Sequence, residues 1–357
     1  LIPDVIIYAA DSLHEVTQHI AGRQKLTRIE KRFVQSRTTA TVAFDFAAIR
    51  GQEHTKRALE VAAAGGHNIL LQGPPGSGKT LLARAFPGIL PDLTYDEALD
   101  VTRIHSITGL LPRDGFISER PFRSPHHTAS GTSLVGGGSQ PRPGEISLAH
   151  RGVLFLDEFP EFSRAVLENL RQPLEDGYIT VARAQRTVSF PARFMLVAAM
   201  NPCPCGYATD PDRPCTCTPV QLMLYRKRLS GPLLDRIDLM IEVPKVPTDR
   251  LIDLAPGESS ADIRARVQCA REKQQQRYAK LRIVTNAELN SDHVRRCIET
   301  TDAAKTLLKQ AVDRYKLSAR AYFRVLKVAQ TITDLSQNHR IDVPELAEAL
   351  QYRQSVE

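Results

Sequence analysis

The sequence lacks any uninterrupted apolar run that approaches the roughly 20 residues needed to cross a bilayer, and it opens without a signal-peptide pattern. We therefore expect a cytoplasmic protein that does not span a membrane. Hydrophobic residues make up 42% of the 357 residues and charged residues 24%, which is typical of folded domains. This balance excludes wholesale disorder and fibrous proteins, and the length predicts two or more domains.

The chain also lacks an initiating methionine, since its first residue is Leu1. Residues 4–9 have the pattern of a buried strand, and a helix capped near Asp11 or Ser12 follows them. This start resembles the tail of something longer. We expect a fragment whose preceding domain has been removed, although an expression boundary would look the same.

Acidic residues are scarce in the predicted linker at residues 22–41. Its only acid is Glu30, against the basic residues Arg23, Lys25, Arg28, Lys31, Arg32 and Arg37. Such a segment either contacts a phosphate backbone or is a solvated connector. The net charge of +7 does not decide between them, because scattered basic residues produce the same total.

Short apolar runs alternate with helical patterns in residues 42–247, which predicts an α/β core with a parallel sheet and helices on both faces. The predicted strands are Asn68–Leu71, Gly152–Leu156, Phe194–Ala199 and Leu239–Val243. Residues 248–357 are charged and rich in Ala and Gln, with helical spacing and no strand-like runs. They predict a second, all-helical lid domain.

A phosphate loop follows the first predicted strand and precedes a helical run. It consists of Gly73, Pro74, Pro75, Gly76, Ser77, Gly78, Lys79 and Thr80. The glycines let backbone N–H groups wrap the phosphates of ATP, and Lys79 supplies a charge to the outer ones. The Thr80 hydroxyl is a predicted Mg²⁺ ligand.

Polar residues that end two other predicted strands complete the site. Asp157 is expected to hold Mg²⁺, and Glu158 to polarise the water that attacks the terminal phosphate. Asn201 is the predicted sensor of that water or phosphate, unless it caps the next turn. Together these residues predict ATP hydrolysis.

Several long strings resemble the magnesium-chelatase-like AAA+ proteins and, within them, the ComM/YifB family. The strings are Phe122–Ser130, Gly136–Glu145, Gly152–Glu158, Asn201–Gly206 and Ser230–Asp238. The resemblance implies a homo-hexameric ring with ATP bound between neighbouring subunits. It also implies that residues 1–21 end a Lon-protease-like domain.

Two arginine assignments follow from this resemblance. Arg236 is the expected arginine finger, a side chain that reaches the ATP bound to a neighbouring subunit. Arg226 and Arg228 are nearby alternatives. Arg320, in the string Leu317–Tyr322, matches the family's second sensor, which implies a place against the phosphates of its own subunit.

Four of the six cysteines cluster as the pairs Cys203 and Cys205, and Cys215 and Cys217. Because thiols stay reduced in the cytosol, this cluster favours a structural Zn²⁺ in an insertion at residues 203–217. The Cys-x-Cys spacing is less usual than Cys-x-x-Cys, so free or redox-active thiols stay an alternative.

Two segments are candidates for DNA contact. Residues 178–190 predict a β-hairpin whose tip carries Arg183 and Arg186. It either faces the pore of the ring, as in the resembling proteins, or lies on the surface. The Gly-rich and Ser-rich segment Thr128–Ser139 is a second candidate, as a mobile pore loop. For the adjacent His126 and His127, packing or hydrogen bonding is favoured over metal binding.

The leading hypothesis is a hexameric ATPase that binds single-stranded or branched DNA and drives branch migration, a helicase action used in natural transformation. Its ATPase part rests on residues, and its branch-migration part rests on the resemblance. The alternatives are a protein-remodelling motor of the magnesium-chelatase type and a slowly turning nucleotide-dependent scaffold.

Overall fold

The computed structural model describes residues 6, 8–28, 44–112, 115–138, 141–183, 186–246, 257–281 and 283–353. The chain divides into two compact units, residues 1–40 and residues 41–357. In the first unit, helix α1 (Leu13–Ile20) begins where the Ser12 hydroxyl accepts from the Glu15 N–H, as its cap predicted. Half of the strand predicted at residues 4–9 and most of the basic linker lie outside the described residues.

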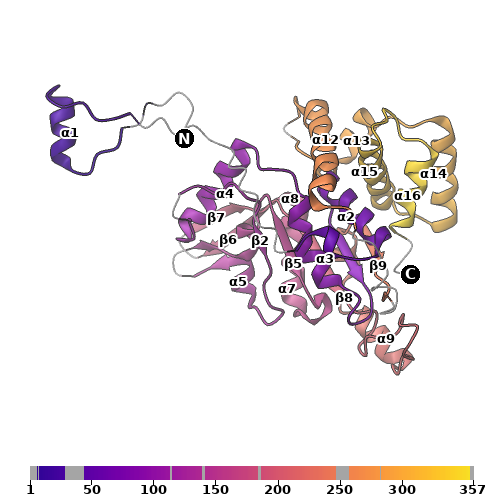
Figure 1. The fold of residues 1–357 in the computed structure, drawn as a ribbon. Helices are drawn as coiled ribbons and strands as arrows, with labels where there is room; N and C mark the ends of the chain where they lie inside the picture. Colours follow the sequence, from indigo (N-terminus) through magenta and orange to yellow (C-terminus); the bar gives the residue numbers. More distant parts are fainter. Residues whose placement is uncertain are drawn as a thin grey trace. The chain divides into compact units, whose positions relative to one another are not determined.

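The second unit is built on a five-stranded parallel sheet with the strand order β2-β5-β8-β1-β9 (Figure 1). Its strands are β1 (Ile69–Gln72), β2 (Phe122–Arg123), β5 (Val153–Leu156), β8 (Met195–Met200) and β9 (Leu239–Glu242). Four of them confirm the predicted strands to within about a residue. Strand β2 was not predicted, because two residues are too few to show a periodic pattern.

Alternate residues of each strand enter two different cores, one on each face of the sheet. Leu71, Val197 and Ile241 belong to the core that includes helices α2, α3 and α12. Leu70 and Leu196 belong to the core that includes α6, α7 and the hairpin. Because both faces are covered, the strands are continuous apolar runs, as is usual for parallel sheets. This confirms the predicted α/β class.

Helices and short 3₁₀ turns connect these strands. They are η1 (Phe46–Ala48), α2 (Glu53–Gly65), α3 (Lys79–Ala85), η2 (Phe86–Ile89), α4 (Tyr95–Ile107), α5 (Gly131–Val135), α6 (Glu145–Leu148), η3 (Phe159–Glu161), α7 (Arg164–Glu168), α8 (Arg171–Asp176), α9 (Pro219–Arg226) and α10 (Gly231–Leu234).

Two antiparallel hairpins project from this core. Strands β6 (Tyr178–Arg183) and β7 (Arg186–Pro191) pair from Tyr178 opposite Pro191 to Arg183 opposite Arg186, which confirms the predicted hairpin. Strands β3 (Gly136–Gly137) and β4 (Arg142–Pro143) form the other. Residues 131–137 are therefore helix α5 and strand β3, and the role of Thr128–Ser139 as a mobile pore loop stays a prediction.

The remaining described residues, from 257 on, form the predicted helical region. Its elements are α12 (Ser260–Tyr278), η4 (Asn286–Glu288), α13 (Ser291–Cys297), α14 (Asp302–Tyr315), α15 (Ala319–Leu335) and α16 (Val343–Gln351). The side chains of Ser259, Thr301 and Ser318 cap α12, α14 and α15 by accepting a backbone N–H of the first turn. Among the described residues, no helix combines the length and apolarity that a membrane crossing requires.

Arg324 of α15 fixes where this helical region meets the core. Its guanidinium donates to the carbonyl of Ile237 over 3.1 Å and pairs with Asp235 at 3.1 Å. Because Ile237 lies just before β9, these contacts place the start of α15 at the amino ends of the strands. Within the helical region, Lys327 Nζ donates to the carbonyl of Ala287 in η4 over 3.0 Å.

Candidate functional site

The phosphate loop connects the end of β1 to the start of α3, in the context that its sequence predicted. Gly76 and Gly78 have φ values of 77° and 90°, which favour glycine. A Cβ on Gly73 would lie 2.2 Å from the carbonyl oxygen of Val243. The loop therefore has the tight glycine-dependent path by which phosphate loops bring backbone N–H groups to a nucleotide.

Lys79 is buried, and its ammonium group lies against the loop. Nζ donates to the carbonyls of Gly73 and Pro74 over 2.7 and 2.9 Å, and to Asn201 Oδ1 over 3.4 Å. Burial lowers the pKa of Lys79 to about 8, although the nearby Asp157 carboxylate opposes this shift. The predicted phosphate-binding lysine and the predicted sensor thus meet.

Thr80 and Asp157, the predicted Mg²⁺ ligands, also meet. The Thr80 hydroxyl donates to Asp157 Oδ2 over 2.8 Å, and Asp157 Oδ1 accepts from the Glu158 N–H over 2.9 Å. Hydroxyl and carboxylate oxygens are the hard ligands that Mg²⁺ prefers. This donor set fits a magnesium ion carried in with a nucleotide.

Glu158 has a partner that sequence reasoning missed. Its Oε2 lies 2.9 Å from His127 Nδ1, its side chain is 55% exposed, and its backbone φ is 52°. His127 reaches it because β2 pairs with β5, opposing Phe122 to Val153. His126 instead contacts the Thr128 hydroxyl. Hydrogen bonding by this histidine pair was predicted, but no local pattern linked it to Glu158.

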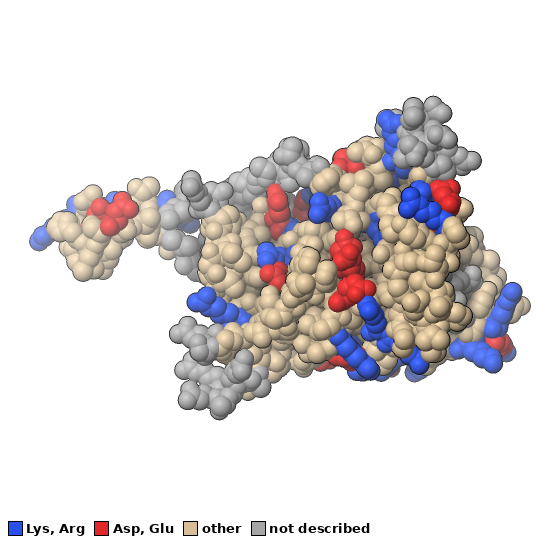
Figure 2. Space-filling model, turned by 90° about the horizontal axis from the view of Figure 1, so that it is seen from below, with Lys and Arg blue, Asp and Glu red and all other residues tan. Residues whose placement is uncertain are grey.

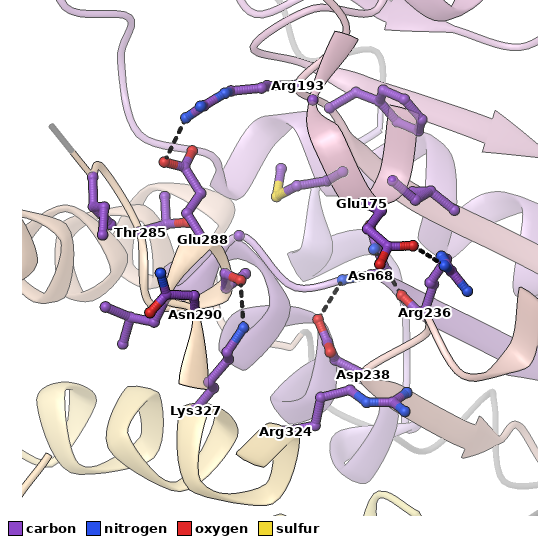
Figure 3. Close-up of a pocket in the computed structure, with 18 of the residues that line it drawn as sticks. Asn68, Glu175, Arg193, Arg236, Asp238, Thr285, Glu288, Asn290, Arg324 and Lys327 are labelled. Carbon is purple, nitrogen blue, oxygen red and sulfur yellow. Dashed lines mark hydrogen bonds and ion pairs between the residues drawn. The ribbon is translucent and has the colours of Figure 1, made fainter. Parts of the chain in front are cut away.

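Arg236 and Arg320 lie away from these residues, on the wall of a cavity of about 800 Å³. Asn68, Gly152 and Asp238, which come just before β1, β5 and β9, line the same cavity. The cavity is therefore at the amino edge of the sheet. As Figure 3 shows, Arg236 is paired there with Glu175.

The expected place of Arg320 against the phosphates of its own subunit is thus wrong for this chain. A four-residue strand separates the two edges of the sheet by about 13 Å, and the phosphate loop follows the opposite edge. The reason is the anchoring of α15 through Arg324, which keeps the exposed Arg320 side chain at the amino edge.

The remaining candidate arginines are also placed. Arg226 is exposed on α9, and the exposed Arg228 pairs with Glu161 at 2.6 Å. Arg183 and Arg186 face each other across the hairpin end in the backbone register. The side chains of these two hairpin residues lie outside the described part of the structure, so their DNA contact stays a prediction.

The four clustered cysteines converge in space. Cys203 Sγ lies 3.3 Å from Cys205 Sγ and 3.7 Å from Cys215 Sγ, and all four sulfur atoms lie within 4.8 Å of one another. Zinc at its usual 2.3 Å from each of four thiolates would separate them by about 3.8 Å. Hydrogen bonds from the Tyr207 and Thr216 N–H groups lower the pKa of Cys205 to about 5. The cluster can hold a metal ion.

The phosphate loop after β1, the two carboxylates after β5 and the helical region together define a nucleotide-binding protein of the AAA+ type. Comparison with known proteins agrees. A family model described as magnesium chelatase, subunit ChlI, matches residues 45–251, and the model of the ChlI C-terminal part matches residues 257–353.

The chain is similar to several curated proteins. It is 46% identical to competence protein ComM of Haemophilus influenzae, over 100% of this chain and 69% of that protein. It is also 46% identical to the uncharacterised protein YifB of Escherichia coli, over 96% of this chain and 66% of YifB. The magnesium-chelatase subunit ChlI of Guillardia theta is 28% identical over 47% of this chain and 54% of that subunit. This chain therefore belongs to the ComM/YifB family of magnesium-chelatase-like AAA+ proteins, and it spans about two thirds of the length of its ComM and YifB relatives.

Proposed function

We propose that this protein is a hexameric, cytoplasmic ATPase that drives branch migration of DNA during recombination. The observation that carries the ATPase part is the convergence of Lys79 with Asn201 and of Thr80 with Asp157 at one edge of the sheet. Thr80 and Asp157 would hold Mg²⁺, which would neutralise phosphate charge. Glu158 polarises the attacking water, and Lys79 binds the outer phosphates.

We further propose that Arg236 and Arg320 act on the nucleotide of a neighbouring copy. Both line the cavity at the edge opposite the phosphate loop, so they face another chain's loop if copies pack head to tail. Repeated head-to-tail contacts close into a ring when the rotation allows it. The Arg236 pair with Glu175 would have to open when a neighbour's phosphates arrive.

The proposal of DNA as the substrate rests on family membership and on the hairpin tip with Arg183 and Arg186. On the face in Figure 2, the described basic and acidic side chains are interspersed rather than gathered into one broad basic area. The hairpin is therefore the more specific candidate for phosphate contact.

The decisive experiment measures ATP turnover and branch migration on three-way and four-way DNA junctions, with Lys79→Ala as the inactive control. We expect DNA to stimulate turnover, and the double variant Arg183→Glu and Arg186→Glu to lose DNA binding while basal turnover persists. Absence of stimulation by single strands, duplexes and junctions would overturn the DNA role. It would favour the protein-remodelling alternative suggested by the magnesium-chelatase family match.

We propose Zn²⁺ as the ion of the four-cysteine cluster. The sulfur separations and the reduced state of cytosolic thiols both support a tetrathiolate zinc site over disulfides. Metal analysis of protein purified in reductant without chelators should give one zinc per chain. A metal-free result would leave the redox-thiol alternative.

A further inference from the structure

We propose that the metal at the four cysteines controls nucleotide binding. The loop that carries these cysteines, residues 203–217 (the metal-binding loop), packs against the phosphate loop. Metal loss would then weaken ATP binding at a distance from the metal itself. This inference rests on the metal part of the proposed function, and it is independent of the DNA part.

The first contact between the two sites is made by Gly206. A Cβ built on Gly206 would lie 2.8 Å from both Cγ and Cδ of Pro75, in the phosphate loop. The φ of Gly206 is 89°, so the position also favours glycine by its backbone. The Gly206 N–H donates to the carbonyl of Cys203 over 3.0 Å. One residue of the metal-binding loop therefore touches the phosphate loop directly.

The second contact runs through Asn201, which lies two residues before Cys203. Its side chain accepts from Lys79 over 3.4 Å, and the preceding Met200 carbonyl accepts from the Gly73 N–H over 3.2 Å. Tyr225 of α9, beyond the second cysteine pair, is buried and hydrogen-bonds the backbone of Asn201. The sensor is thus held on both sides by segments that flank the cysteines.

A bound metal would restrain this loop more strongly than its exposed ion pair between Asp212 and Lys245 at 2.8 Å. Among residues 204–218 only Gly206 is buried, so the loop has little apolar packing of its own. Segments with few buried contacts open readily, whereas a tetrathiolate metal site supplies folding energy directly. Without metal, we expect Gly206 and Asn201 to shift, and with them Pro75 and Lys79.

The test compares the affinity for a fluorescent ATP analogue, with Mg²⁺ and without DNA, across matched variants. Cys215→Ser breaks the metal site without touching the phosphate loop, and Cys269→Ser is the control on α12, outside the cluster. We expect Cys215→Ser to lose zinc and to raise Kd about tenfold, which corresponds to about 1.4 kcal/mol, while Cys269→Ser keeps both zinc and affinity.

Gly206→Ala tests the contact between Gly206 and Pro75 independently of metal binding. This variant retains all four thiols, so we expect one zinc per chain together with a Kd raised several-fold. If Cys215→Ser misfolds, the same test is made on the native chain. A chelator removes the zinc and zinc is then added back, and we expect the affinity for the ATP analogue to fall and then recover. Unchanged affinity in metal-free protein that is folded by circular dichroism would overturn the coupling. If the protein purifies without metal, both the coupling and the zinc assignment are overturned. If DNA does not stimulate ATP turnover, only the proposed DNA role is affected.

Discussion

The two edges of the central sheet carry different chemistry. At the carboxyl edge, Lys79 contacts Asn201 and Thr80 contacts Asp157, and these are the groups proposed to hold the phosphates and Mg²⁺. At the amino edge, Arg236 and Arg320 line a cavity, and Arg236 is held by an acid of its own chain. The first edge contains the groups proposed to bind and activate the nucleotide, while the second contains cations that lie across the sheet from the phosphate loop of their own chain.

Under the proposed head-to-tail packing, each chain would carry two halves of different sites. If copies pack head to tail, the carboxyl edge of one meets the amino edge of the next, and every interface gains one full set of groups. A separated chain is then expected to bind ATP but to hydrolyse it poorly. Four experiments, in order of decreasing expected effect, test the difference between the two edges of the sheet.

The largest effect is expected for Arg236→Ala, with a fall in ATP turnover of about 10³-fold, as for other arginine fingers. Mixing Arg236→Ala chains with Lys79→Ala chains should restore part of the activity, because an intact loop then meets an intact arginine. Turnover is measured by phosphate release. Mixtures that stay inactive would contradict the action of Arg236 on a neighbouring chain. A comparable loss of turnover in Arg228→Ala or Arg226→Ala would identify that residue as the arginine finger.

Glu158→Gln tests the carboxyl edge alone. Removing the group that polarises water should lower turnover by about 10²-fold or more, while ATP affinity stays within a factor of about two because the phosphate contacts remain. Single-turnover kinetics and nucleotide binding are measured on the same preparation. Unchanged turnover would point to a nucleotide-dependent scaffold.

The burial of Lys79 predicts that ATP binding depends on pH. Burial lowers its pKa to about 8 in the empty site, and bound phosphate raises it again, so binding takes up a proton above that pH. ATP affinity should be steady from pH 7 to 8 and then fall by up to about tenfold per pH unit. Titrations with Lys79→Ala should lack this fall. A flat profile in the unmodified chain up to pH 10 would be incompatible with it.

His127→Ala is expected to have the smallest effect. The His127 contact occupies an oxygen of Glu158, and exposed pairs of this kind contribute about 0.2 to 1 kcal/mol. Releasing the carboxylate should raise basal turnover by up to about fivefold. His126→Ala is the neighbouring control: the His126 ring lies 4.2 Å from that of His127, but its Nδ1 contacts the Thr128 hydroxyl and not Glu158. A decrease would mean that His127 positions Glu158 for catalysis rather than restraining it.

Local patterns in the sequence determined the strands, the phosphate loop, the hairpin and the helical region. Each depends on residues that are close in the chain: an apolar run of four to six residues, glycines at fixed offsets, or a cap followed by a helical pattern. Thr80, Asp157 and Asn201 were also predictable, because the carboxyl ends of parallel strands share one edge of a sheet. The cysteine pairs were visible from their spacing.

Only the tertiary structure decided which groups meet across long separations. The pairing of β2 with β5 brings His127 to Glu158, and the cysteine loop folds back so that Gly206 touches Pro75. Arg320 lies at the amino edge because Arg324 anchors α15 there. The physical reason is that docking depends on a few side-chain contacts between distant segments, which leave no periodic trace in either segment.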